Sequence, residues 1–242
     1  MVRLINSDDF DSLISKVKLP ERLTQQADYL VDAAFLNFSA ITDIKGALQS
    51  GRLRLPIDIS KFESAQKSQI LEIIINIKKG VPAFRATRTL IETTARYTLL
   101  LKANQIMLDQ NIRRNNSTIS KLESAATSAS ASKLTSTFSS TLNADALAII
   151  ADQLTNEYST LNNFTHGNPA LQYESAVSDY VAHLPFEIEN NLHVATQAFL
   201  ISAFLLVFYG QKLVKGTILS REQFYFLEKS NAIPNDLIDT IR

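Results

Sequence analysis

The chain has 242 residues, 45% of them hydrophobic, so it is long enough to bury a substantial core and to fold alone. Its 24 basic and 24 acidic residues give a formal net charge of zero, so any contact with nucleic acid must be local. The absence of cysteine excludes disulfides, thiolate zinc sites and cysteine nucleophiles. Asp8 and Asp9 interrupt the apolar run that a secretion signal needs, and we predict a cytoplasmic protein.

The spacing of apolar residues predicts an all-α fold in a single domain covering residues 1–242. Only six glycines and six prolines occur, and apolar residues recur with helical periodicity between them. In chain order we predict helices over 20–49, 60–79 and 82–116, a helix capped at 143 or 145 that ends near 166, a short helix over 171–183, a long apolar helix through 209, and short helices after 220 and 234, with an extended connection over 53–59.

Residues 124–141 are rich in serine, threonine and alanine, with the run Ser-Ala-Ser-Ala-Ser over 128–132 at their centre. Small polar side chains bury too little apolar surface to offset the entropy lost on ordering. We interpret this segment as a flexible connection. The alternative is a polar extension of the neighbouring helices, which alanine tolerates.

The most apolar segment, 194–209, is predicted to be a buried core helix. Thr196, Gln197 and Ser202 interrupt it, and it is shorter than the roughly 20 residues that a membrane span needs. A membrane-associated protein is the alternative, and we predict no membrane partner.

Arg88, Glu92 and Arg96 share one edge of the helix predicted over 82–116. Such a ladder is typical of a solvated face with ion pairs of about 0.3–0.5 kcal/mol each. Leu99 and Leu101, however, lie on two sides of the same helix, which indicates that both sides are packed. We therefore expect the charges to be partly buried and to have partners.

Tyr158, Asn162 and His166 share one edge of a later helix, whose end is marked by Gly167 and Pro169. A neutral imidazole can take a proton from a ribose hydroxyl near pH 7, and an arginine can hold the phosphate. These are the parts of a metal-independent site that cleaves RNA. The alternative role for His166 is a C-cap that interacts with the helix dipole.

The predicted site therefore combines the two helices. His166 is the general base, and Arg88 or Arg96 binds the phosphate. Glu92 holds the arginines in place, while Asn162 and Tyr158 orient the substrate or the histidine.

Two acid–histidine pairs offer a weaker prediction of a metal site. Asp179 precedes His183 by four residues, and Glu189 precedes His193 by four. The Glu-x-x-His spacing of di-iron helical bundles is absent, so we predict no metal and no cofactor. The chain also lacks the glycine-rich motifs of dinucleotide-binding proteins and P-loop NTPases and the Gly-x-Ser-x-Gly motif of α/β-hydrolases.

Two patches resemble uncharacterised bacterial helical proteins related to the HEPN superfamily. One is residues 77–97, with a Lys-Gly and an Arg-x-Leu-x-Glu pattern, and the other is residues 158–168, which end in His-Gly-small. The resemblance implies a HEPN-like helical bundle, here with additional C-terminal helices, that is often a homodimer. Many HEPN proteins are ribonucleases of toxin or antiviral (phage) defence systems and use an Arg-polar-x-x-x-His motif.

On this chain the polar position of that motif is Asn162 and its histidine is His166, whereas its arginine position holds Leu161. One hypothesis is therefore an RNA-directed protein that acts as a metal-independent endoribonuclease. The alternative is a non-catalytic helical interaction protein that dimerises or binds a protein partner, and Leu161 favours it.

Overall fold

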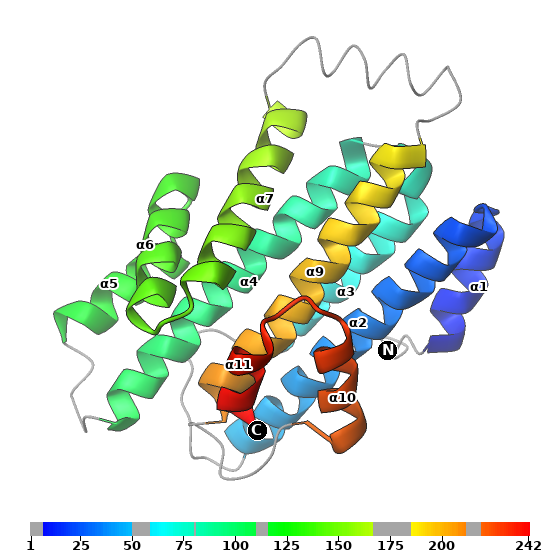
Figure 1. The fold of residues 1–242 in the computed structure, drawn as a ribbon. Coiled ribbons are helices and arrows are strands. Elements are labelled where there is room, and N and C mark those ends of the chain that lie inside the picture. Colours follow the sequence, from blue (N-terminus) through cyan, green and yellow to red (C-terminus); the bar gives the residue numbers. More distant parts are fainter. Residues whose placement is uncertain (1–6, 50–58, 80, 110–115, 167–184, 212–218) are drawn as a thin grey trace.

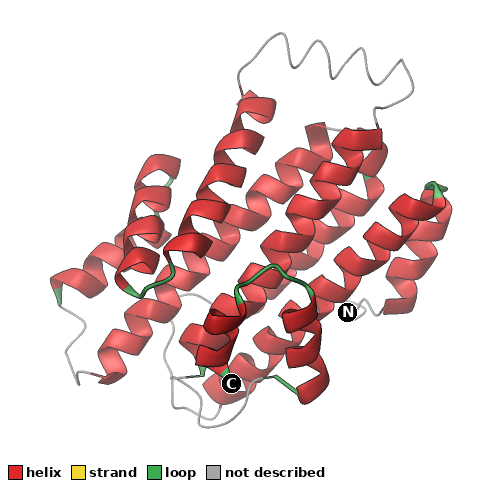
Figure 2. Ribbon diagram, viewed as in Figure 1, coloured by secondary structure: helices red, strands yellow, loops and turns green. Residues whose placement is uncertain are grey.

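The computed structural model describes residues 7–49, 59–79, 81–109, 116–166, 185–211 and 219–242, and every regular element in these ranges is a helix (Figures 1 and 2). The predicted all-α class is confirmed. The helices are α1 (Ser7–Val17), α2 (Glu21–Gln49), α3 (Ile59–Ile75), α4 (Val81–Asp109), α5 (Ser117–Ala126), α6 (Ala131–Ala144), α7 (Ala148–His166), α9 (Pro185–Gly210), α10 (Arg221–Lys229) and α11 (Asn235–Ile238), with short 3-10 helices η1 (Ile77–Lys79) and η2 (Asp239–Ile241).

Most of the long helices begin and end within a few residues of their predicted positions. The short helix α1 was not predicted, and it packs against α2 and α3. The predicted connection over 53–59 and the predicted helix over 171–183 lie outside the described residues, apart from Ile59, which begins α3.

Helix α9 lies between α2 and α7 in Figure 1 and packs against α2, α4 and α7. Phe199, Phe204 and Leu205 on it are fully buried. Among the described residues, one helical stretch, Ile188–Gly210, is long and apolar enough to cross a membrane, and 83% of its most apolar window is buried inside the protein. Its apolar surface is covered by protein, as the prediction of a core helix requires.

Helix α4 belongs to two groups of helices at once. With α2, α3 and α9 it forms the core group, in which Leu30, Ile70 and Leu90 are fully buried. Helices α5, α6 and α7, which we call the side group, also pack against α4. Most of α4 is therefore shielded from solvent, because each group covers part of its surface.

The segment 124–141 is ordered as helix, which corrects the expectation of a flexible connection. It contains the end of α5, a short turn and most of α6. Ser130 caps α6 by accepting a hydrogen bond from the backbone N–H of Lys133. Leu134 and Phe138 are buried along one side of α6. These apolar anchors, spaced one helical turn apart, supply the burial that the average composition of the segment conceals.

A relay of buried polar side chains joins three helices of the core group. Asn37 on α2 donates a hydrogen bond to the Gln66 side-chain carbonyl on α3, and Gln66 Nε2 donates to Ser202 Oγ on α9 at 3.2 Å. Asn37 and Gln66 are completely buried, and Ser202 is 1% exposed. Because buried polar groups are costly without partners, this relay favours one register of the three helices.

The C-terminal residues begin a new helix where the sequence predicted one. Ser220 and Gln223 form a capping box at the start of α10, with each side chain bonded to the backbone of the other residue. Gln223 also donates to Ser39 Oγ of α2 at 2.8 Å, which fixes α10 against the core group.

Replacing Gln66 by methionine should lower the free energy of unfolding by about 2–4 kcal/mol, because it leaves the Asn37 amide and the Ser202 hydroxyl buried without a partner. Urea unfolding followed by circular dichroism measures the change. Gln25→Met, at an exposed position on α2, is the matched control and should stay within about 0.5 kcal/mol of the wild type. Equal stability of the two variants would contradict a structural role for the relay.

Candidate functional site

The charged ladder of α4 faces the side group and is half-buried. The Arg88 and Glu92 side chains retain 18% and 22% of their exposure. Arg85, one turn earlier, is exposed. The ladder is therefore not a solvated face along its whole length, and its central residues meet partners on other helices.

Arg88, Glu92 and Tyr158 form a closed hydrogen-bonded group, which we call the Tyr158 cluster. Arg88 Nη2 lies 2.9 Å from Glu92 Oε1, and the Tyr158 hydroxyl donates to the same oxygen at 2.8 Å. Arg88 Nη2 also donates to Tyr158 Oη at 3.2 Å, and its guanidinium carbon lies 5.3 Å from the centre of the tyrosine ring. Helices α4 and α7, whose residues the sequence combined into one predicted site, thus meet at these three residues.

The environment of Tyr158 keeps its hydroxyl protonated. Burial raises the pKa of Tyr158, and the hydrogen bond to the Glu92 carboxylate raises it further, whereas Arg88 acts in the opposite direction. A neutral phenol can donate to Glu92, and a phenolate could not. At neutral pH this cluster therefore works as a fixed contact between α4 and α7.

Arg96 lies away from this cluster, and its side chain bonds to the C-terminal end of α5. Its Nη1 donates to the backbone carbonyls of Ala126 and Ser128, both at 2.7 Å. Carbonyl groups in the last turn of a helix lack partners within the helix, and an arginine is well suited to satisfy them. Arg96 therefore secures the end of α5, and its guanidinium is directed to the backbone there.

The remaining predicted residues lie further along α7. Asn162 is one turn beyond Tyr158, and His166 is the last residue of α7. The His166 side chain lies outside the described residues. Eight residues separate Tyr158 from His166, or about 12 Å along the helix axis at 1.5 Å per residue. The contact of Arg88 with Tyr158 is thus two turns from the position predicted to supply the general base.

A second cluster with the same kinds of group, a cation, a carboxylate and a tyrosine, lies further along α4. Lys102 Nζ is 2.7 Å from Asp145 Oδ1, and the hydroxyl of Tyr209 on α9 donates to Asp145 Oδ2 at 2.7 Å. Burial raises the pKa of Tyr209, and the Asp145 charge raises it further. Asp145 is the C-cap of α6 and not the cap of α7 that the sequence offered as an alternative. The recurrence of a tyrosine, a carboxylate and an α4 cation indicates a packing contact in both places.

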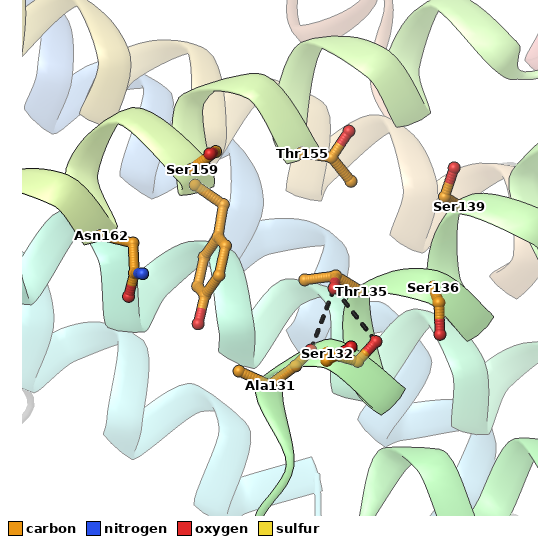
Figure 3. Close-up of a pocket in the computed structure, with 9 residues that line it drawn as sticks. Ala131, Ser132, Thr135, Ser136, Ser139, Thr155, Ser159 and Asn162 are labelled. Atoms are coloured by element: carbon orange, nitrogen blue, oxygen red, sulfur yellow. Dashed lines mark hydrogen bonds between the residues drawn. The ribbon is translucent and has the colours of Figure 1, made fainter.

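An open groove of about 480 Å³ lies between α6 and α7 (Figure 3). Figure 3 shows its side chains coming from the two facing helices. Seven of the nine lining residues carry a hydroxyl group, and none of the nine is charged. The lining residues are Ala131, Ser132, Thr135, Ser136 and Ser139 of α6 and Thr155, Tyr158, Ser159 and Asn162 of α7.

Sequence reasoning missed this groove, although a signal was present. Ser132, Thr135, Ser136 and Ser139 recur at one-turn spacing, and Thr155 and Ser159 do the same. Once both segments are known to be helical, that spacing predicts a hydroxyl-rich edge on each. The interpretation of residues 124–141 as a flexible connection concealed it.

In the part of the chain that is described, no group of three or more potential metal ligands occurs. Glu189 pairs with Arg22 and accepts a hydrogen bond from Gln26 at 3.1 Å. His193 is exposed. Asp179 and His183 lie outside the described residues.

Comparisons with known proteins found no matching family model, no matching curated protein and no matching solved structure. Function must therefore be argued from the geometry of the chain.

The stability of the protein should fall as the pH rises above about 10, the pKa of an unfolded tyrosine. The raised pKa of Tyr158 means that the folded state keeps a proton that the unfolded state loses, so the stability is fully present below pH 10 and declines above it. Tyr158→Phe should make this decline shallower, by at most about 1.4 kcal/mol per pH unit for one proton. Urea unfolding between pH 8 and pH 11 tests this, and equal slopes for the two proteins would contradict it.

Proposed function

We propose that this protein is a non-catalytic helical interaction protein that forms a homodimer through the groove between α6 and α7. The observation that carries the proposal is the commitment of both candidate phosphate-binding arginines to internal contacts. Arg88 is bonded to Glu92 and Tyr158, and Arg96 is bonded to the end of α5. A substrate phosphate would have to displace contacts that join α4 to the side group.

The groove has the chemistry that a surface needs in order to pair with itself. In a two-fold dimer the same patch from each subunit meets its copy, so like charges in the patch would repel. The groove lining has no charge. The hydroxyls of Thr135, Ser136 and Thr155 already donate to carbonyls of their own helices, but a hydroxyl oxygen that donates can still accept a hydrogen bond from a partner. The small side chains of the groove would also let the helices of a second subunit approach closely.

The same lining is poorly suited to nucleic acid. Affinity for nucleic acid depends largely on cations that neutralise phosphates, and neither lysine nor arginine lines the groove. A second copy of this chain therefore fits the groove better than RNA does.

Ser159→Arg should convert the homodimer to a monomer, because it places a bulky cation in the groove and brings two such cations together across the dimer axis. Size-exclusion chromatography with light scattering measures the mass. Thr160→Arg is the matched control, since Thr160 is the next residue, is exposed and does not line the groove. It should remain a dimer.

A monomeric wild type, or loss of the dimer in both variants, would refute this use of the groove. Circular dichroism establishes that each variant is folded, so a change in mass reports association alone.

An RNA-cleaving protein of a bacterial toxin or antiviral defence system is the second candidate. It rests on the sequence resemblance, with the packing of the arginine-bearing helix against the helix that ends at His166 as the favouring observation. Catalysis would require the Tyr158 cluster to open and Arg88 to reach a phosphate held near His166.

The second candidate predicts that the wild type cleaves single-stranded RNA in the presence of EDTA. His166→Ala should then abolish cleavage, by at least about 100-fold for loss of a general base, while the helical signal in circular dichroism is unchanged. A wild type without cleavage, or a variant as active as the wild type, would eliminate His166 as a catalytic residue.

A further inference from the structure

A second cavity, of about 360 Å³, lies between α2 and α9 and shares no lining residue with the groove. It is bordered by aromatic, amide and imidazole groups and by one cation. The side chains that matter for its chemistry are Arg22, Gln25, Gln26 and Tyr29 of α2 and His193 and Gln197 of α9.

The cation that borders this cavity is paired, and two further carboxylates, Asp32 and Glu157, interact electrostatically with Tyr29 and His193. Arg22 pairs with Glu189, and Gln26 Nε2 donates to the same carboxylate oxygen at 3.1 Å. Both the cation and the carboxylate are thus engaged with each other. A neutral ligand does not compete with this ion pair, whereas an anion would also be repelled by the Asp32 and Glu157 carboxylates.

Those contacts also set the orientation of the Gln26 amide. Its nitrogen faces Glu189, and its oxygen is buried while no described residue donates a hydrogen bond to it. A buried acceptor without a donor costs about 1–3 kcal/mol. A ligand N–H at this oxygen would remove that cost. Because the oxygen has almost no accessible surface, the Gln26 side chain has to turn toward the cavity to meet the ligand.

The α9 wall of the cavity offers hydrogen-bond donors, and α2 offers an aromatic ring. Gln197 Oε1 accepts a hydrogen bond from Gln153 at 3.2 Å, which leaves its amide nitrogen as a donor, and His193 is exposed beside it. Tyr29 packs on Phe226 with the ring centres 5.2 Å apart. Burial raises the pKa of Tyr29, as does the Asp32 charge, so the phenol stays neutral.

We propose that this cavity binds a small, neutral, planar molecule that presents an amide edge, an N–H donor beside a carbonyl acceptor, as the base of a pyrimidine nucleoside does. The ligand N–H bonds to Gln26 Oε1. Its carbonyl accepts from the Gln197 amide or the His193 imidazole, and its ring lies against Tyr29. This site is independent of the groove and of dimer formation.

Uridine and 3-methyluridine are the matched probes, because they have nearly the same shape and the methyl group replaces the N–H of the amide edge. Binding is followed by NMR through the imidazole signals of His193, identified by their loss in His193→Gln. Uridine should move these signals, and 3-methyluridine should bind at least about tenfold more weakly because the Gln26 oxygen then lacks its donor.

Gln26→Met, which keeps the length of the side chain and removes the acceptor, should weaken uridine binding by about tenfold, and its folded state is checked by urea unfolding. Equal shifts with the two nucleosides would overturn recognition of an amide edge. No shift of the His193 signals at millimolar uridine would overturn this ligand class for the cavity. Neither result depends on whether the Ser159→Arg variant dissociates.

Discussion

The packing of α4 between two groups of helices is the constraint on which the rest of the structure depends. A helix that is covered on more than one side cannot leave its charged side chains in solvent, and an unpaired buried charge is costly. Arg88, Arg96 and Lys102 accordingly bond to Tyr158, to the end of α5 and to Asp145. These contacts hold the side group against the core group.

This constraint changes how the charged ladder is understood. In both polar clusters along α4 a tyrosine hydroxyl donates to a carboxylate that also pairs with an α4 cation. A catalytic interpretation explains only the cluster near α7, whereas a packing role explains both. The groove is different, because apart from Tyr158 its hydroxyl groups belong to serine and threonine side chains on an open surface between α6 and α7.

Helix α7 connects the two surfaces to which we assign binding. Thr155 and Ser159 line the groove shared with α6, whereas Gln153 bonds to Gln197 on α9 beside the second cavity. Successive residues of one helix thus serve two sites because a rotation of 100° per residue directs them to different neighbours. Arg88, Glu92 and Arg96, to which the sequence assigned catalytic roles, hold the helices together. The lining of the groove has no charged side chain, and the lining of the second cavity holds one arginine.

Helical periodicity was enough to predict α2, α4 and the buried apolar helix α9, and the apolar residues on two sides of α4 were enough to predict that its charges are half-buried. The sequence suggested that the edge with Arg88 and Glu92 could lie beside the edge with Tyr158, but not which residues of the two edges touch. The role of Arg96 at α5, the groove and the cavity beside Gln26 did not follow. Periodicity describes one helix at a time, whereas these features depend on which helices touch and in what register, and that is set by the packing of the whole chain.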